Sequence, residues 1–288
     1  MSKRSASSAP TRRPNWTNAA GEQIASFSSL DARLERAQKH LDDLHVEIAR
    51  LFAAHVNPEF FVCYNDDSQP GKRRIDIVNT ANTTTVSLIA SDAVHNIRSA
   101  LNYLYFNLAV FYGTVEPFKD KELKGIQFRA PKTAKAYKAA IRGEVKRFRK
   151  DVAKMLRALY SNGRMRRTLW RLNHISNKDK HCALLGIGVK GEGWRSLKQE
   201  APPPISPTSD EGSTETIKAA LALPFPLKNH TIIARIPNAN AGDEMQVSFQ
   251  IALNQPGIIV GEPVIETLDD MFDLASTIIE SFRPYFRP

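Results

Sequence analysis

The chain has 288 residues, which is enough for one large or two small domains, and 42% of them are apolar, so a hydrophobic core can form. The formal net charge of +10 favours a polyanionic partner. Two cysteines, Cys63 and Cys182, are too few for a disulfide scaffold or a four-cysteine zinc site, and no apolar run reaches the roughly 18 residues of a membrane span. We therefore expect a cytoplasmic protein that does not contact a membrane.

The chain changes character near residue 28. Residues 1–27 are rich in Ser, Arg, Pro and Asn and carry little hydrophobic pattern, so we expect a disordered basic arm. From about Ser29 to Ala54, apolar residues recur at alternating spacings of four and three, which predicts an amphipathic helix of a bundle or helical hairpin. These apolar positions are Leu30, Leu34, Ala37, Leu41, Leu44, Ile48 and Leu51.

The middle of the chain is predicted to be mainly helical. Two short apolar runs, 60–64 and 74–78, flank a segment dense in turn-forming residues, which predicts a β-hairpin near 58–79. A second long helix is expected at about 85–112, and shorter helices follow it. We therefore expect residues 28–190 to form a helical domain with a β-hairpin insertion.

The last third of the chain has a different pattern. Residues 191–216 are rich in Pro and Ser and predict a linker or long loop. Alternating apolar residues then predict strands within 217–260, with a hairpin joining Thr231–Ile236 to the strand at 245–251. Residues 217–288 are expected to combine these strands with a C-terminal helix that packs back on the bundle. The predicted fold class is α+β, a helical bundle with small antiparallel β-sheet elements.

The second long helix carries an unusual polar side. Polar residues gather on one side of it, and apolar residues precede and follow them on that side. This polar group contains no Lys or Glu, which is uncommon for a solvated helix face. Three interpretations remain open: a functional cluster, a structural hydrogen-bond network, and a solvated face. The polar residues are Asp92, His95, Arg98, Ser99 and Asn102.

A second polar group lies at 173–181. We expect a helix junction there, with Ser176 or Asn177 capping a short helix that carries Asp179 and His181. A histidine in the first turn of a helix is disfavoured in its protonated form by the helix dipole, which suits a proton acceptor. The alternative is a solvated turn.

Two chemistries fit these two groups. In the first, His95 or His181 acts as general base or acid, and Arg98 stabilises the charge that develops during metal-independent cleavage of RNA. In the second, Asp92, His95, Asp179 and His181 hold a metal ion, since Asp-x-x-His places both side chains on one side of a helix. The candidate catalytic residues are Asp92, His95, Arg98, Asn102, Asp179 and His181.

A strongly basic stretch runs from 141 to 171. It holds eleven Lys and Arg residues against two acids, Glu144 and Asp151, and Phe148, Tyr160 and Trp170 lie among them. Such a stretch is typical of surfaces that contact phosphates, and its alternative is a solvated helix face. The candidate nucleic-acid-binding residues are Arg142, Lys146, Arg147, Arg149, Lys150, Arg164, Arg166, Arg167 and Arg171.

The polar helix resembles a bacterial family of uncharacterised proteins. The family carries a D-x-x-H-N-L-R-S-A-L-D-H-L helix and a later D-K-H turn, matched here by 92–102 and by 179–181. Asn102 stands where the family has Asp, and Tyr103 where it has His. The resemblance covers roughly 30–185, and the family has no established activity to carry over.

The chain is also distantly similar to HEPN-type helical domains, many of which are ribonucleases of toxin and defence systems. Their signature is an Arg followed, after four to six residues, by a His. The pairs Arg33/His40, Arg50/His55 and Arg167/His174 have this spacing. The similarity implies a metal-independent endoribonuclease.

These observations lead to one main hypothesis and two rivals. The main hypothesis is a basic protein that binds RNA or cleaves it as a HEPN-like endoribonuclease of defence or toxin type. The rivals are a non-catalytic protein of a defence or regulatory assembly, and a metal-dependent hydrolase of the bundle type. No Gly-rich phosphate loop, nucleophile elbow or His-Glu-x-x-His motif occurs, so we expect no cofactor. RNA or another polyanion is the expected partner, and a homodimer or larger assembly is considered.

Overall fold

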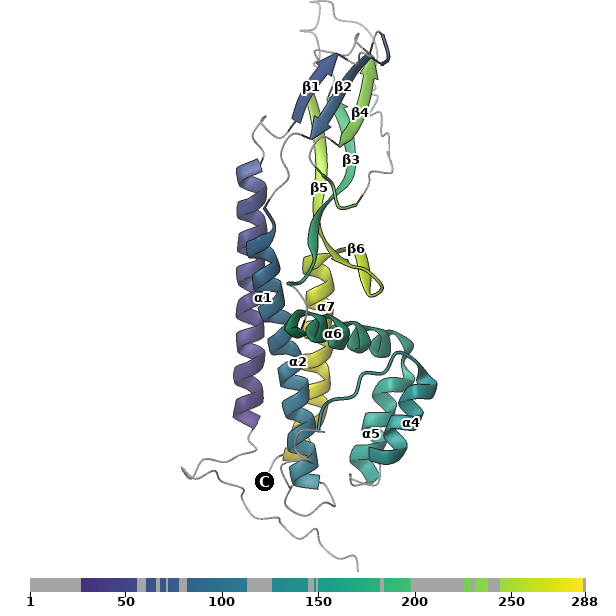
Figure 1. The fold of residues 1–288 in the computed structure, drawn as a ribbon. Helices are drawn as coiled ribbons and strands as arrows, with labels where there is room; N and C mark the ends of the chain where they lie inside the picture. Colours follow the sequence, from purple (N-terminus) through teal and green to yellow (C-terminus); the bar gives the residue numbers. More distant parts are fainter. Residues whose placement is uncertain are drawn as a thin grey trace, which may run out of the picture. The chain divides into compact units, whose positions relative to one another are not determined.

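The computed structural model has an α+β architecture, with helices and two small antiparallel sheets (Figure 1). The residues that it describes are 27–55, 61–65, 68–70, 72–77, 82–112, 126–144, 148, 150–181, 184–197, 225–228, 231–237 and 244–286. The helices are α1 (Phe27–His55), α2 (Thr84–Tyr112), α4 (Ala134–Glu144), α5 (Lys150–Ser161), α6 (Gly163–His181), α7 (Val264–Phe282) and the short 3-10 helix η3 (Arg283–Phe286). The strands are β1 (Phe61–Asn65), β2 (Lys72–Ile77), β3 (Ile187–Leu197), β4 (Ile232–Pro237), β5 (Glu244–Gln255) and β6 (Ile259–Pro263).

The chain divides into two compact units, and segments of the two units alternate along the sequence. The first unit comprises residues 1–36, 96–170 and 273–288. The second comprises residues 37–95 and 171–272. Helices α1, α2, α6 and α7 each contribute residues to both units, and each unit is described below by itself.

The apolar periodicity of α1 and α2 corresponds to buried positions. Six of the seven seam positions predicted for α1 are buried, while Leu34 is half-buried. On α2, seven apolar residues that recur at helical spacing are all inaccessible to solvent. These α2 residues are Ala93, Val94, Ile97, Ala100, Leu101, Leu104 and Leu108.

Local polar caps fix where several helices begin. Asn162 separates α5 from α6, and its side-chain oxygen accepts hydrogen bonds from the main-chain N–H groups of Arg164 and Met165. The Thr133 hydroxyl accepts from the N–H of Ala136 at the start of α4. Such side chains satisfy N–H groups that the first helical turn leaves without a partner.

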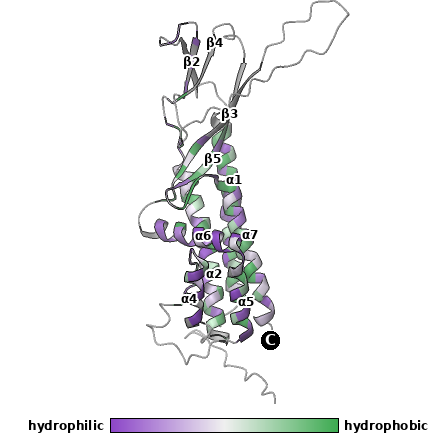
Figure 2. Ribbon diagram, turned by 90° about the vertical axis from the view of Figure 1, so that its right-hand side faces the viewer, coloured by the Kyte–Doolittle hydropathy of each residue, from purple (hydrophilic) through white to green (hydrophobic). Residues whose placement is uncertain are grey.

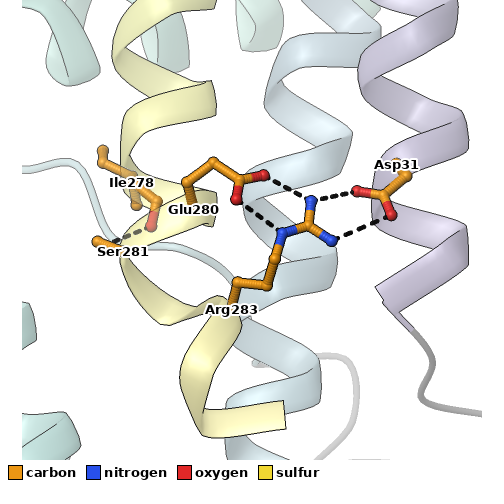
Figure 3. Close-up of polar contacts among 5 residues, drawn as sticks. All are labelled: Asp31, Ile278, Glu280, Ser281 and Arg283. Atoms are coloured by element: carbon orange, nitrogen blue, oxygen red, sulfur yellow. Dashed lines mark hydrogen bonds and ion pairs between the residues drawn. The ribbon is translucent and has the colours of Figure 1, made fainter. Parts of the chain in front are cut away.

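An arginine joins the two ends of the described chain within the first unit (Figure 3). The Arg283 guanidinium donates to the Asp31 carboxylate of α1 and to the Glu280 carboxylate of α7, with a shortest distance of 2.7 Å to Asp31. Its central carbon also lies 4.3 Å from the centre of the Phe27 ring. The hydrogen bond that Arg283 donates to Glu280, followed by the one it donates to Asp31, raises the pKa of Arg283 above its usual value.

Both sheets belong to the second unit and are antiparallel. In one, β2 lies between β1 and β4; in the other, β5 lies between β3 and β6. The predicted hairpin near 58–79 is confirmed, because β1 pairs with β2. A turn at Gly257, which has a φ of 80°, joins β5 to β6, as glycine tolerates this left-handed conformation.

The hairpin predicted between 231–236 and 245–251 is wrong. Strand β4 pairs with β2, whereas β5 pairs with β3 and β6. The twelve-residue β5 finds an eleven-residue partner in β3, far away in the sequence. Hairpin prediction relies on closeness along the chain, and these long-range pairings give no local signal.

Several predicted segments are only partly described. Strand β3 takes in residues 191–197, which the sequence assigned to the linker. The expected basic arm, apart from residue 27, and the remainder of the linker, 198–216, lie outside the described residues. Cys182 and the side chain of Cys63 also lie outside them. Among the described helices, none combines the length and apolar character needed to cross a membrane.

Candidate functional site

Two residues of the predicted polar cluster hold a distant main-chain segment in the first unit. Arg98 is 4% exposed and donates a hydrogen bond from its guanidinium to the carbonyl oxygen of Phe128. One helical turn later, the side-chain oxygen of Asn102 accepts from the N–H of Phe128 at 3.1 Å. The Phe128 ring is itself buried and meets the edge of Tyr105. Arg98 and Asn102 therefore form hydrogen bonds with both main-chain polar groups of the buried Phe128.

Ser99, the residue after Arg98, joins α2 to α1 in the same unit. Its hydroxyl accepts a hydrogen bond from the Arg33 guanidinium at 2.7 Å. The Arg33 guanidinium carbon also lies 4.9 Å from the centre of the Tyr103 ring, a cation–π distance. Three polar residues of the α2 motif thus have partners within the protein, as the structural hydrogen-bond interpretation predicts.

Asp92 and His95 have a different environment, in the second unit. Both side chains are exposed, and Leu88, one turn before Asp92, is exposed as well. The predicted polar side of α2 is therefore not enclosed as one cluster: its Asp92–His95 portion faces solvent, and its Arg98–Asn102 portion is in contact with protein. The candidate residues are also divided between the units, with Arg98 and Asn102 in the first and the other four in the second.

The segment 173–181 is not a helix junction. It forms the C-terminal half of α6, which runs without interruption from Gly163 to His181. Ser176 is buried inside this helix and caps nothing, while Asn177 is exposed. His181 is the last helical residue, so it does not stand in the first turn of a helix as predicted. The side chains of Asp179 and His181 lie outside the described residues.

No metal-binding group is found in the part of the chain that the structure describes. There, no three His, Cys, Asp or Glu side chains come together in a way that could hold an ion. This covers Asp92 and His95, but the side chains of the other two proposed ligands lie outside the description.

The basic stretch forms an exposed surface in the first unit. Helices α4 and α5 lie side by side (Figure 1), and the buried Tyr137 hydroxyl of α4 donates to the carbonyl oxygen of Leu156 in α5 at 2.7 Å. Figure 2 colours many residues of α4 and α6 as hydrophilic. Between 132 and 167, the exposed Lys and Arg side chains that the structure describes are Lys132, Lys135, Lys138, Arg142, Lys150, Lys154, Arg157, Arg164 and Arg167.

Two regular rows stand out within this surface. Lys135, Lys138 and Arg142 form the α4 row, and Lys150, Lys154 and Arg157 form the α5 row. Each row has spacings of three and four residues, so its members lie on one side of their helix. Within the described part of the chain, none of the six side chains forms an ion pair or a hydrogen bond.

Other members of the predicted basic set differ in environment. Arg171 belongs to the second unit, where it forms a two-bond ion pair with Glu262 of β6, at 2.7 and 2.9 Å. Arg166 is half-buried. The side chains of Lys146, Arg147 and Arg149 lie outside the described residues.

The aromatic residues of the stretch are mainly structural where they are described. Phe148 is 5% exposed and packs edge-on against Tyr105. Trp170 is half-buried, and the Lys132 ammonium group lies 4.8 Å from the centre of its ring. The side chain of Tyr160 lies outside the described residues.

Sequence reasoning missed part of both sites. Lys135 and Lys138 precede the predicted basic stretch, although their three-residue spacing already indicates one helix face. The Ser91 hydroxyl of α2, which accepts from the N–H of Leu185, gave no comparable signal, because its partner is 94 residues away.

Comparison with known proteins adds no family to this description. No protein-family model, no curated protein sequence and no solved structure matches the chain. The resemblance to the bacterial family and the similarity to HEPN domains therefore stay predictions.

Proposed function

We propose that this protein binds RNA through the phosphate backbone, in the cytoplasm, with the exposed cations of α4, α5 and the start of α6. The observation that carries the proposal is the large excess of positive over negative side chains in this region. Between 126 and 170 the sequence has fourteen Lys and Arg residues against two acids, a net charge of +12 within a chain total of +10. The rest of the chain taken together is thus slightly acidic, so this region accounts for the positive net charge of the protein.

Electrostatics explains why such a surface favours a polyanion. Cations that lie close together without carboxylate partners repel one another, and this repulsion destabilises the folded state. A phosphate backbone relieves the repulsion and releases its condensed counterions when it binds, which favours association at low salt. The contacts that this mechanism uses are sequence-independent.

The test is binding of a fluorescently labelled RNA stem-loop by the full chain, followed by anisotropy between 50 and 200 mM salt. A variant with both rows replaced by Gln removes six cations. If these contact phosphates, the wild-type affinity falls about a thousandfold over this salt range, and the variant loses most of that dependence.

A matched pair of variants controls for net charge. The α5-row variant, K150Q/K154Q/R157Q, is compared with K39Q/K72Q/K228Q, which removes three exposed lysines elsewhere. Both lower the net charge equally, and only the first is expected to weaken binding. Equal binding by both variants, or no binding of the stem-loop by the wild type, would contradict the proposal.

A second candidate function is RNA cleavage without a metal. The observation that favours it is the exposure of Asp92 and His95, three residues apart on α2, where a substrate can reach an acid–base pair. Arg98 is not available for such a role in the described conformation, because it is buried against the Phe128 carbonyl group.

Cleavage is tested with labelled single-stranded RNA in the presence and absence of EDTA. EDTA-resistant cleavage that is lost in both H95A and H181A supports a ribonuclease. Cleavage that EDTA abolishes supports the metal-dependent hydrolase instead. Intact RNA in all samples leaves binding without catalysis as the function.

A further inference from the structure

We infer that the nucleic acid recognised by the α4 and α5 rows is double-stranded, with one row placed along each strand. This inference rests on the proposed function and specifies its substrate class. It depends on which side of the two helices the rows occupy, and the contact between the helices determines that.

The helices form an antiparallel pair. Only five residues, 145–149, connect them, and short connections join antiparallel neighbours. The contact between Tyr137 and Leu156 agrees, because these residues lie at nearly equal distances along the chain from that connection. Each of the two residues also marks the side of its helix that faces the other.

Helical geometry then places the rows. At about 100° per residue, the α4 row lies about 100° to 160° from Tyr137, and the α5 row lies about 100° to 160° from Leu156, in the same rotational direction. Viewed along one axis, antiparallel helices turn in opposite directions. Equal rotation angles therefore place both rows on the same side of the plane that contains the two helix axes. On that side, the side chains of one row point away from those of the other.

The dimensions suit two phosphate rows better than one. Packed helices lie about 8–10 Å apart, and the rows lie farther apart than the axes because they diverge. The major groove of B-form DNA is about 12 Å wide, so the phosphates that border it have a comparable separation. Each row spans about 10 Å along its helix, which corresponds to about three phosphates of one strand.

A single strand offers only one line of phosphates and would occupy one row at a time. A duplex neutralises both rows together. Both RNA and DNA duplexes present two lines of phosphates, although the major groove of A-form RNA is narrower than that of B-form DNA, so the experiment includes both.

The experiment compares 20-base-pair RNA and DNA duplexes with unstructured single strands of the same length, by anisotropy with the full chain. We expect the duplexes, or one of them, to bind at least tenfold more tightly than the strands. The comparison of the RNA duplex with the DNA duplex shows which of the two the protein binds more tightly. Single strands that bind as tightly as both duplexes would overturn the inference.

The row variants test the placement. K135Q/K138Q/R142Q and K150Q/K154Q/R157Q should each lower the salt slope for duplex binding by about 2 to 3, since each lost phosphate contact contributes about 0.9. Loss confined to one row would overturn the inference. Thermal melting verifies that each variant folds, and the wild-type comparison of duplex with strand decides the matter if one does not. Failure of the stem-loop to bind at all contradicts the proposed function instead.

Discussion

Arg98 and Asn102 give the polar residues of α2 a structural role. Together they satisfy the carbonyl and N–H groups of Phe128, whose side chain is 1% exposed. Main-chain groups that folding removes from water need such partners, because an unsatisfied group destabilises the fold. A structural hydrogen-bond network was one of the three interpretations that the sequence left open, but the sequence did not identify the segment around Phe128 as the partner.

Replacing Arg98 with Ala should lower the free energy of unfolding by about 2–3 kcal/mol, since a buried carbonyl group loses a charged donor. Urea unfolding of the purified variant measures this. Thr85→Ala serves as the control: Thr85 is exposed on the same helix, and its replacement should change stability by less than about 0.5 kcal/mol. An R98A variant as stable as the control would refute the structural role.

Asn102 allows a more selective prediction. Asn102→Ala removes the acceptor for the Phe128 N–H group and should destabilise the protein by about 1 kcal/mol. Asn102→Asp keeps an acceptor oxygen at the same place and should retain most of the stability. Thermal melts at neutral pH compare the two, and equal losses in both variants would show that the acceptor is unimportant.

At the scale of elements, periodicity predicted the helices well and the strand pairing poorly. Helices α1 and α2 follow from apolar spacing, because helix hydrogen bonds are local and one face alone must be buried. Strand β4 pairs with β2 and β5 pairs with β3, which lie far away in the chain, so these pairings depend on which edges the fold brings together. Local sequence patterns also do not predict ion pairs such as that of Arg283 with Asp31, which lie 252 residues apart.

Arg283→Ala should separate the start of α1 from the end of α7 and destabilise the protein by about 1 kcal/mol. The effect is modest because Arg283, Asp31 and Glu280 are all partly exposed and water screens their charges. The loss should be larger at 20 mM than at 500 mM salt. Urea unfolding at both salt concentrations tests this, and a salt-independent loss would assign the effect to the contact with Phe27 instead.

For the whole molecule, the notable property is the uneven distribution of charge. The net charge of +12 between 126 and 170 is not balanced nearby, since Asp151 is the only acidic side chain described there. Such a region stays folded against its own repulsion, which salt reduces.

The wild-type melting temperature should therefore rise when salt increases from 20 to 300 mM, and it should rise less in the variant that lacks both rows. A relief of about 1 kcal/mol corresponds to about 2–4 °C for a protein near this size. Thermal melts without nucleic acid measure both proteins. An identical salt response would mean that the rows carry no appreciable mutual repulsion.

The sequence by itself determined the fold class, the long helices, the first hairpin and the basic stretch, because all of these depend on residues close together in the chain. Only the tertiary structure decided that β4 pairs with β2, that α6 continues through the expected junction, and that Arg98 and Asn102 hold Phe128. It also provided the contact of Tyr137 with Leu156, from which we infer that the rows of α4 and α5 share one side. Each of these outcomes depends on contacts between residues distant in the sequence, and no local pattern encodes which distant groups will meet.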